Sequence, residues 1–398
     1  MALNVRHPVW LSAEQPGANA FALLFLLESF ARASLTTVIP LQVYFIFQNK
    51  ESVSLVYTSL AAVTFVLNFM IPFAIRFLSR RWAYTAGAVM IGSCGLMMSL
   101  GMPTTQIIAM LVRNVGAAAM SVSLNLYIMD NIRKQDFVKS EPLRLGVATL
   151  AWTVAPSLGA WLFHEYGILA TAAFSVAFVI PTIALFWYLR MKEGGPIRKA
   201  VIRAPNPFRQ IKRFAGQPRL RMAWLIAFTR SAYWVTAFVY IPILMVEGGL
   251  GPVAGGLGVS AANALLFSSL FLTPLARRFT VRRMLGWANV AAGAVILIAG
   301  IVAVQNLVWA AIILAGAAAA VTVVDGLGSI PFMRAVRIHE RAEMTTVYRT
   351  YLDAADLIPQ MVYFVIFQVA GFSGAFVTLG VFTALTGFVC LKYLPAKL

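Results

Sequence analysis

Long apolar runs recur along the whole chain and constrain its fold more than any other feature. A helix of about 20 apolar residues crosses a hydrocarbon core of roughly 30 Å. The sequence predicts twelve such helices, over residues 18–46, 53–76, 83–102, 106–130, 143–163, 168–189, 222–246, 253–276, 284–304, 307–332, 348–369 and 372–393. Hydrophobic residues make up 60% of the chain and charged residues 12%, which leaves too little polar surface for a soluble globule. We therefore expect an all-α, multi-pass membrane protein.

A ten-residue segment occurs twice, 202 residues apart. Residues 72–81 read PFAIRFLSRR and residues 274–283 read PLARRFTVRR, with six identical positions. The same offset pairs residues elsewhere, namely Ser29 with Ser231, Ile39 with Ile241 and Pro40 with Pro242. A repeat of this kind is typical of transporters built from two similar halves. We predict two pseudo-symmetric six-helix bundles, residues 1–189 and residues 222–398.

A basic segment, residues 190–221, separates these two halves. It contains ten Lys or Arg residues and one Glu. Within it, residues 206–214 (NPFRQIKRF) place Phe208, Ile211 and Phe214 at helical spacing with basic residues between them. This pattern predicts a cytoplasmic linker with a short amphipathic helix lying on the anionic inner leaflet.

Most basic residues fall on one side of the predicted membrane. If both termini are cytoplasmic, 28 of the 32 Lys and Arg residues lie in the termini or in loops on that side. The exceptions are Lys50 in a short outer loop and Arg32, Arg113 and Arg230 inside predicted helices. The formal charge of +18 therefore indicates topology by the positive-inside rule rather than nucleic-acid binding. We expect a bacterial-type inner (plasma) membrane protein that contacts the bilayer and no nucleic acid.

The twelve helices, the basic central linker and an Arg pair after the second helix of each half (Arg80-Arg81 and Arg282-Arg283) together resemble the major facilitator superfamily. The resemblance covers essentially the whole chain. It implies a secondary transporter that binds a small-molecule solute, works by alternating access and needs no cofactor. Because the sequence contains no ATP-binding signature, an ion gradient or the solute's own gradient must drive transport.

The loop signature of that family, Gly-x-x-x-Asp-Arg-x-Gly-Arg-Arg, is only partly present. Its final Arg pair is kept in both halves. Pro72 and Pro274 stand at the Gly position, and Arg76 and Arg278 stand at the Asp position. The same departure in both halves argues against random decay. The resemblance assigns both segments to gating on the cytoplasmic side.

Two segments inside predicted helices also resemble motifs of the family. Arg113-Asn-Val-Gly116 in the fourth helix is similar to a membrane-buried Arg motif, so Arg113 is a candidate to bind an anionic solute or to tune a carboxylate. Residues 151–159 (AWTVAPSLG) in the fifth helix are similar to the antiporter signature Gly-x-x-x-Gly-Pro-x-x-Gly. Pro156 there permits a bend, which implies gating and efflux by antiport. The alternative is ordinary packing of small residues.

Charged side chains inside predicted helices mark the candidate site, because each costs roughly 2.5–3.5 kcal/mol at the bilayer centre. Glu28 and Arg32 are four residues apart on the first helix and lie on one face within reach of each other. Arg230 occupies the position equivalent to Glu28 on the seventh helix. Since the resemblance implies that these two helices face one another, we predict a charge cluster of the three residues at a central cavity. Aromatic surface nearby is expected from Tyr233, Trp234 and Tyr240.

A buried carboxylate beside an Arg residue can couple solute binding to a proton. Burial disfavours the ionised carboxylate and a neighbouring guanidinium favours it, so a solute that displaces the Arg would load a proton. Glu28 is the first candidate for this role, and Asp325 in the tenth helix, beside two Gly residues, is the second. The alternatives are that Glu28 and Arg32 pair only to aid insertion, and that Asp325 pairs with a neighbouring Arg near the inner end.

Asp353 and Asp356 lie near the inner end of the predicted eleventh helix. In the family, the Asp-bearing loop after the second helix abuts the eleventh helix and closes the inner side. The resemblance therefore implies an inverted latch in which Arg76 pairs with one of the two Asp residues. Arg278 with Glu141 would be the weaker mirror pair. The alternatives are that the Asp residues line the inner cavity or favour a helix N-terminus.

Sixteen Met residues raise the alternative of copper(I) transport, since that ion prefers thioether and thiolate ligands. The pattern is weak, because Met is a common apolar filler and Cys94 has only Met97 and Met98 near it. We predict no metal site, and no set of catalytic residues stands out. The favoured interpretation is a monomer that exports a small organic compound in exchange for protons. Uptake of an organic anion or zwitterion, soft-metal transport and a non-transporting assembly factor are the alternatives.

Overall fold

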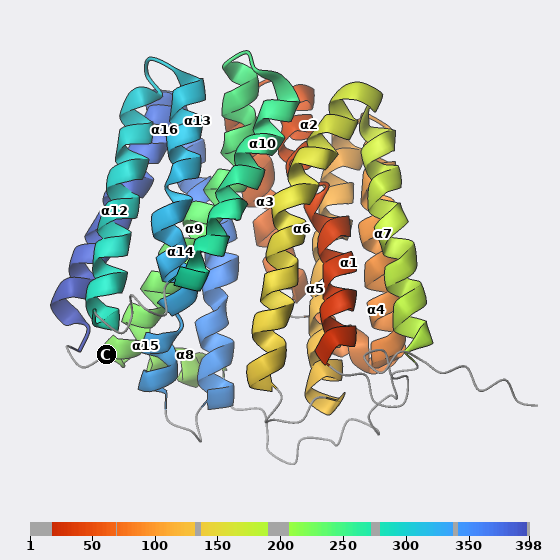
Figure 1. Cartoon of the computed structure of the whole chain (residues 1–398), viewed down its shortest axis with the longest axis horizontal. Coiled ribbons are helices and arrows are strands. Elements are labelled where there is room, and N and C mark those ends of the chain that lie inside the picture. The colour runs from red at the N-terminus through yellow and green to blue at the C-terminus, as the bar shows by residue number, and fades with distance from the viewer. Residues whose placement is uncertain are drawn as a thin grey trace, which may run out of the picture. The chain divides into compact units, whose positions relative to one another are not determined.

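The computed structural model describes residues 18–68, 70–131, 137–189, 207–271, 279–336 and 341–395, and every regular element in these ranges is a helix (Figure 1). The helices before the linker are α1 (Ala18–Ala33), α2 (Val38–Phe47), α3 (Lys50–Asn68), α4 (Ile71–Met98), α5 (Pro103–Asn131), α6 (Phe137–Tyr166) and α7 (Ile168–Tyr188). The later helices are α8 (Pro207–Ala215), α9 (Pro218–Glu247), α10 (Gly251–Ala264), the 3-10 helix η2 (Leu265–Phe271), α12 (Val281–Val302), α13 (Leu307–Gly316), α14 (Ala318–Leu327), α15 (Ile330–Ala335) and α16 (Arg341–Tyr393).

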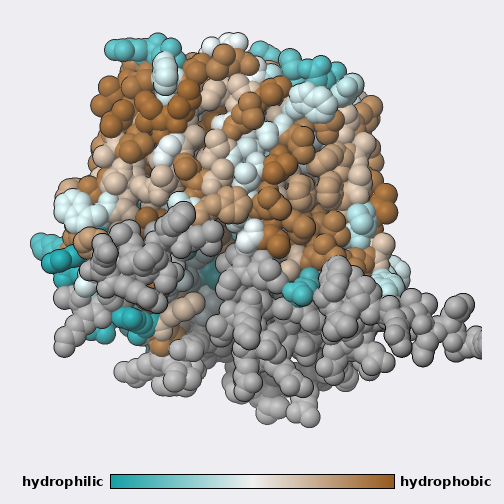
Figure 2. All heavy atoms as spheres, in the orientation of Figure 1, coloured by the Kyte–Doolittle hydropathy of each residue, from teal (hydrophilic) through white to brown (hydrophobic). Residues whose placement is uncertain are grey.

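Each of the twelve predicted spans contains helix in its described residues. Nine helical segments of the described ranges are long and apolar enough to cross a membrane. One of them, Met344–Tyr393, is two helices in one, because Gly371 adopts φ 56° and turns the chain. Apolar side chains cover most of the helical surface visible in Figure 2. The predicted all-α membrane fold is confirmed.

The chain forms two compact units. One comprises residues 1–46 with 62–198, and the other comprises residues 47–61 with 199–398. The first part of α3 therefore belongs to the second unit, although its sequence lies in the first repeat. The boundary near residue 198 falls within the predicted linker, whose amphipathic segment forms helix α8.

The first copy of the repeated segment is helical throughout, whereas the span predicted from the sequence ends at residue 76. The predicted span 53–76 is interrupted after Asn68, and α4 begins at Ile71 with Pro72 in its first turn. Proline suits that position, because a first-turn residue needs no N–H donor. In the second copy, residues 272–278 lie outside the described ranges, and Arg282 and Arg283 lie in the first turn of α12. Both Arg pairs thus extend a helix rather than form a loop.

Helices α12 and α16 pack with their backbones almost in contact. A Cβ atom added at Gly380 would lie 2.8 Å from the Gly293 carbonyl oxygen, and one added at Gly387 would lie 2.7 Å from the Gly286 carbonyl oxygen. Side chains at these positions would force the helices apart. Small residues at such spacing allow the close approach that stabilises helix pairs in membranes.

Candidate functional site

The predicted first span is broken in the middle. Helix α1 ends and α2 begins only after a turn at residues 34–37. Within this turn Ser34 Oγ donates a hydrogen bond to the Ala31 carbonyl at 3.1 Å. Thr36 Oγ1 donates to the Arg32 carbonyl at 3.2 Å. Hydroxyl side chains of this kind compete with backbone N–H groups for carbonyls and favour a break.

Neighbouring helices supply further donors to the same two carbonyls. Ser175 Oγ on α7 donates to the Ala31 carbonyl at 2.8 Å. Arg113 Nη2 on α5 donates to the Arg32 carbonyl at 3.0 Å. Backbone groups freed by a helix break must be satisfied inside a membrane protein, and here side chains of two other helices do so. Arg113 is thereby bonded directly to the backbone of Arg32, a member of the predicted charge cluster.

Helix α6 also meets the break closely. Gly159, the last residue of the antiporter-like segment, packs against the Ser34 backbone so tightly that a Cβ atom would overlap the Ser34 carbonyl. The Gly159 carbonyl accepts a hydrogen bond from Thr171 Oγ1 on α7 at 3.0 Å. Pro156 lies buried in α6, and its gating role stays a prediction.

The pair of Glu28 and Arg32 predicted from their spacing is present. Arg32 Nη1 donates to Glu28 Oε1 at 3.0 Å. The Glu28 side chain is only 1% exposed, whereas the Arg32 side chain is 29% exposed. Arg113 binds the backbone at the break, and Arg32 pairs with Glu28 one turn before it. Of the pair, Arg32 is accessible and Glu28 is not.

A second charged cluster lies in the other unit, where α9 meets α14. Arg230 Nη1 on α9 donates to Asp325 Oδ1 on α14 at 2.7 Å. Trp234 Nε1, one turn further along α9, donates to Asp325 Oδ2 at 3.0 Å. Both carboxylate oxygens thus accept from one face of α9. Asp325 needs these donors, because a negative charge near a helix C-terminus is otherwise unfavourable.

Arg230 has further contacts around the same ion pair. Its Nη2 donates to Ser231 Oγ at 3.1 Å and lies 3.4 Å from the Tyr351 hydroxyl oxygen, which accepts from it. The guanidinium carbon is 5.7 Å from the centroid of the Tyr351 ring. The ion-pair partner of Arg230 is thus Asp325. The predicted approach of Arg230 to Glu28 involves two separate units and stays a prediction.

Of the three aromatic residues predicted to line the cavity, one contacts the charged cluster and two are buried elsewhere. Trp234 binds Asp325, but Tyr233 and Tyr240 are fully buried, which corrects the expectation that they present open surface. Tyr233 donates to the Leu314 carbonyl at 2.9 Å, next to the boundary between α13 and α14. Its hydroxyl thus joins α9 to the C-terminal part of α13.

Tyr240 belongs to a buried hydrogen-bond chain within the second unit. Its hydroxyl donates to Gln360 Oε1 at 2.5 Å. Ser54 Oγ lies 2.6 Å from the Tyr240 oxygen and must donate to it, since the Tyr240 proton is already used. These two hydrogen bonds connect the first part of α3 to α9 and α16.

The predicted gating residues are only partly described. Arg81 stacks over Trp187, with its guanidinium carbon 5.1 Å from the ring centroid. Arg282 donates to the Leu391 carbonyl near the end of α16, and Arg283 borders a cavity between α12 and α14. Asp353 and Asp356 lie on α16, the first half-buried and the second exposed. The side chains of Arg76, Arg80, Glu141 and Arg278 lie outside the described set, so both latch pairs stay predictions.

Sequence reasoning missed Ser175 and Tyr351. A neutral polar residue in an apolar helix carries no charge signal, and neither has a motif around it. For metals, the described residues hold no group of three or more His, Cys, Asp or Glu that could bind an ion. The Cys94 and Met98 sulfur atoms are 3.7 Å apart within α4.

The comparisons with known proteins agree on one fold. The family model described as Major Facilitator Superfamily matches residues 21–358. A solved POT family transporter in complex with 5-aminolevulinic acid is 12% identical with a TM-score of 0.72, covering 94% of this chain and 95% of its own. The nucleoside transporter NupG is 12% identical with a TM-score of 0.69, covering 94% and 98%. A bacterial homologue of the iron transporter ferroportin in an inward-facing state is 13% identical with a TM-score of 0.71, covering 94% and 98%. No curated protein sequence matches the chain at a significant level.

Proposed function

Because this chain belongs to the major facilitator superfamily, we propose that it takes up a small organic solute with an anionic group together with protons. Transport across a membrane as such follows from the family and the fold. The coupling ion, the solute class and the direction are the proposal. The antiporter-like segment, whose Gly159 packs against the broken first helix, favours the alternative of export in exchange for protons.

The observation that carries the proposal is the unequal exposure of the Glu28 and Arg32 pair. Arg32 is 29% exposed and Glu28 is 1% exposed. A solute anion can approach the Arg32 guanidinium and compete with Glu28 for it. Arg113 adds a second cation at the Arg32 carbonyl. The positive charge of the two guanidinium groups favours an anionic group over a cationic one.

Proton coupling follows from that competition. A buried carboxylate that loses its guanidinium partner is favoured in the neutral form, so Glu28 takes up a proton when the solute occupies Arg32. When the solute leaves, Arg32 returns to Glu28 and the proton is released. Solute and proton are then bound and released together, so both move in the same direction.

Asp325 is better suited to hold α9 and α14 together than to carry the proton. Its two oxygens already accept from Arg230 and Trp234. A proton on either oxygen would face a donor, so protonation requires that one of these contacts opens. Glu28 accepts from Arg32 on its own helix, so this contact can open without any movement between helices.

The test begins with a solute search. Purified protein in detergent is screened by thermal shift against anionic, zwitterionic and cationic metabolites and drugs, because a bound ligand raises the melting temperature. The strongest hit is then given to proteoliposomes that contain a pH-sensitive dye. We expect anionic compounds to dominate the hits, and an inward solute flux to be matched by a proton flux in the same direction.

Glu28→Gln is the decisive variant, with Glu51→Gln in the first turn of α3 as the matched control. We expect Glu28→Gln to keep the thermal shift but to lose solute-driven proton flux, while the control keeps both. Normal transport with normal pH dependence in Glu28→Gln would refute the coupling role. Opposite movement of solute and protons would instead support export by exchange, and no flux with any hit would support a non-transporting protein.

A further inference from the structure

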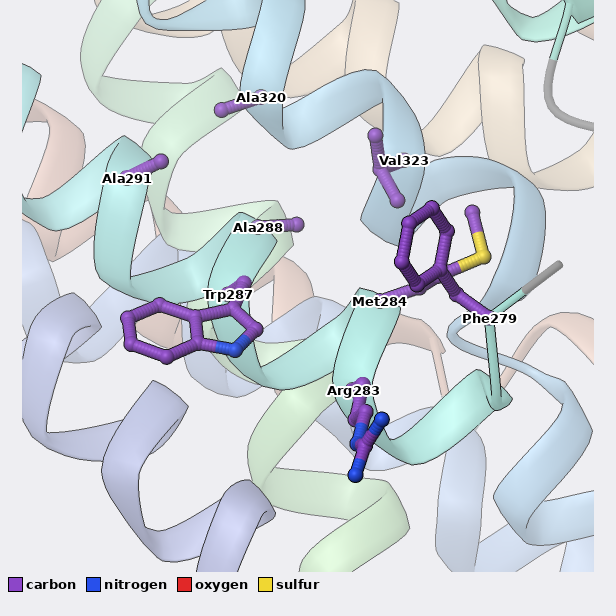
Figure 3. A pocket seen from close by; sticks show the side chains of 8 residues that line it. All are labelled: Phe279, Arg283, Met284, Trp287, Ala288, Ala291, Ala320 and Val323. Atoms are coloured by element: carbon purple, nitrogen blue, oxygen red, sulfur yellow. The ribbon is translucent and has the colours of Figure 1, made fainter. Parts of the chain in front are cut away.

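A cavity of about 690 Å³ lies between α12 and α14 within the second unit, and its lining shares no residue with either charged cluster. Its size is within the range of roughly 300–1,000 Å³ that is typical of ligand sites. Figure 3 shows Trp287 and Phe279 on opposite sides, with small side chains between them and the Arg283 guanidinium at one end. The cavity is therefore an apolar space with a single cation.

The cavity opens to the surface of the helices. Trp287 is 59% exposed and Phe279 is 49% exposed. Ala291 on α12 and Ala320 on α14 contribute only methyl groups to the lining, which leaves a groove between the two helices. On a helix surface that crosses a membrane, such a groove is exposed to acyl chains.

The Arg283 end of the cavity is suited to an anion. Arg283 lies in the first turn of α12, where the helix dipole and the first N–H groups favour negative charge. Its side chain is exposed, and no acidic side chain within the described ranges forms an ion pair with it. Trp287 follows one turn later, and Trp is enriched at the boundary between headgroups and acyl chains. The distribution of basic residues predicts this helix end on the cytoplasmic side.

We infer that this cavity binds one anionic phospholipid of the cytoplasmic leaflet. The phosphate lies at Arg283 and the N-terminus of α12, and an acyl chain lies in the groove past Ala291 and Ala320. A soluble anion would leave the apolar groove unfilled, and an uncharged apolar molecule would form no ion pair with Arg283. A lipid with a negatively charged headgroup matches both ends. This site is independent of the proposed solute and proton sites.

Native mass spectrometry of the full chain, delipidated in detergent, measures this binding with phosphatidylglycerol and phosphatidylcholine as probes. We expect one tightly bound phosphatidylglycerol and weaker binding of phosphatidylcholine. Arg283→Ala should weaken the phosphatidylglycerol affinity about fivefold, since a basic residue near the surface contributes about 1 kcal/mol. Arg219→Ala removes an equally exposed Arg from the first turn of α9 and is the control.

A second variant tests the groove. Ala291→Leu fills the cavity and should also weaken phosphatidylglycerol binding, whereas Ala261→Leu at an exposed position of α10 should not. Melting temperatures of all four variants show that each is folded. The proposal is overturned if Arg283→Ala and Arg219→Ala lose phosphatidylglycerol affinity equally, or if Ala291→Leu loses none. It is also overturned if inorganic phosphate protects the protein from thermal unfolding as well as phosphatidylglycerol does.

Discussion

The first helix of each repeat has the same Ile-Pro pair, yet only one of the two helices is broken. Pro40 follows the turn at residues 34–37, whereas Pro242 lies inside α9, which runs unbroken from Pro218 to Glu247. Proline alone therefore does not decide the break. The difference lies in the donors, since Ser175 and Arg113 on other helices bind the carbonyls that the first break frees. A helix in a membrane can open where its neighbours replace the lost hydrogen bonds.

The ion pairs of the two units differ in a related way. Glu28 and Arg32 belong to one helix, so their contact can persist while that helix moves as a body. Arg230 and Asp325 are 95 residues apart and join α9 to α14. The first pair responds to a competing ligand, and the second responds to a separation of helices.

Removing the charge from the pair between helices should have the largest effect on stability. Asp325→Asn leaves Arg230 without its counter-charge, and because the pair is half-buried the cost is below the value of about 3 kcal/mol for a fully buried pair. We expect a clear fall in melting temperature, with partial recovery in the double variant Arg230→Gln with Asp325→Asn. Glu28→Gln should have less effect, because the Glu28 and Arg32 pair joins no second helix. Equal falls for the two single variants would remove the distinction between the pairs.

A methyl group added where α6 meets the break should destabilise the protein, although less than Asp325→Asn does. A methyl group added elsewhere on α6 should stabilise it. Gly159→Ala drives a Cβ atom into the Ser34 carbonyl, and overpacking costs about 1–3 kcal/mol. Gly146→Ala on α6 meets no atom within 4 Å and should gain up to about 1 kcal/mol from helix propensity. Thermal shift in detergent measures both. If Gly159→Ala were neutral, α6 would not constrain the break.

The smallest expected effect tests whether donors from other helices hold the break. Ser175→Ala removes the hydrogen bond from α7 to the Ala31 carbonyl and should cost about 1 kcal/mol. Ser93→Ala removes a bond within α4, from Ser93 Oγ to the Met90 carbonyl, and serves as the control. Hydrogen exchange over residues 30–42 should increase in Ser175→Ala alone. A change of equal size in the control would assign the effect to general loosening.

The sequence predicts the membrane helices well because the bilayer imposes their length and apolar character. Glu28 and Arg32 are predictable for a similar reason, since spacing on one helix determines their contact. The partner of Arg230 is not, because Asp325 lies on another helix and only tertiary packing brings them together. The helical character of residues 77–81 is not predicted either, because basic residues commonly mark loops between membrane helices, whereas α4 extends through them.

The backbone contact between α12 and α16 has a practical consequence for measuring movement. Helices that touch at glycines without intervening side chains cannot slide without a clash, so the distance between two probes placed on them should stay constant throughout the cycle. Spin labels on this pair would provide an internal length standard. Any distance change measured elsewhere in the second unit can then be assigned to the probe's own helix rather than to the frame of reference.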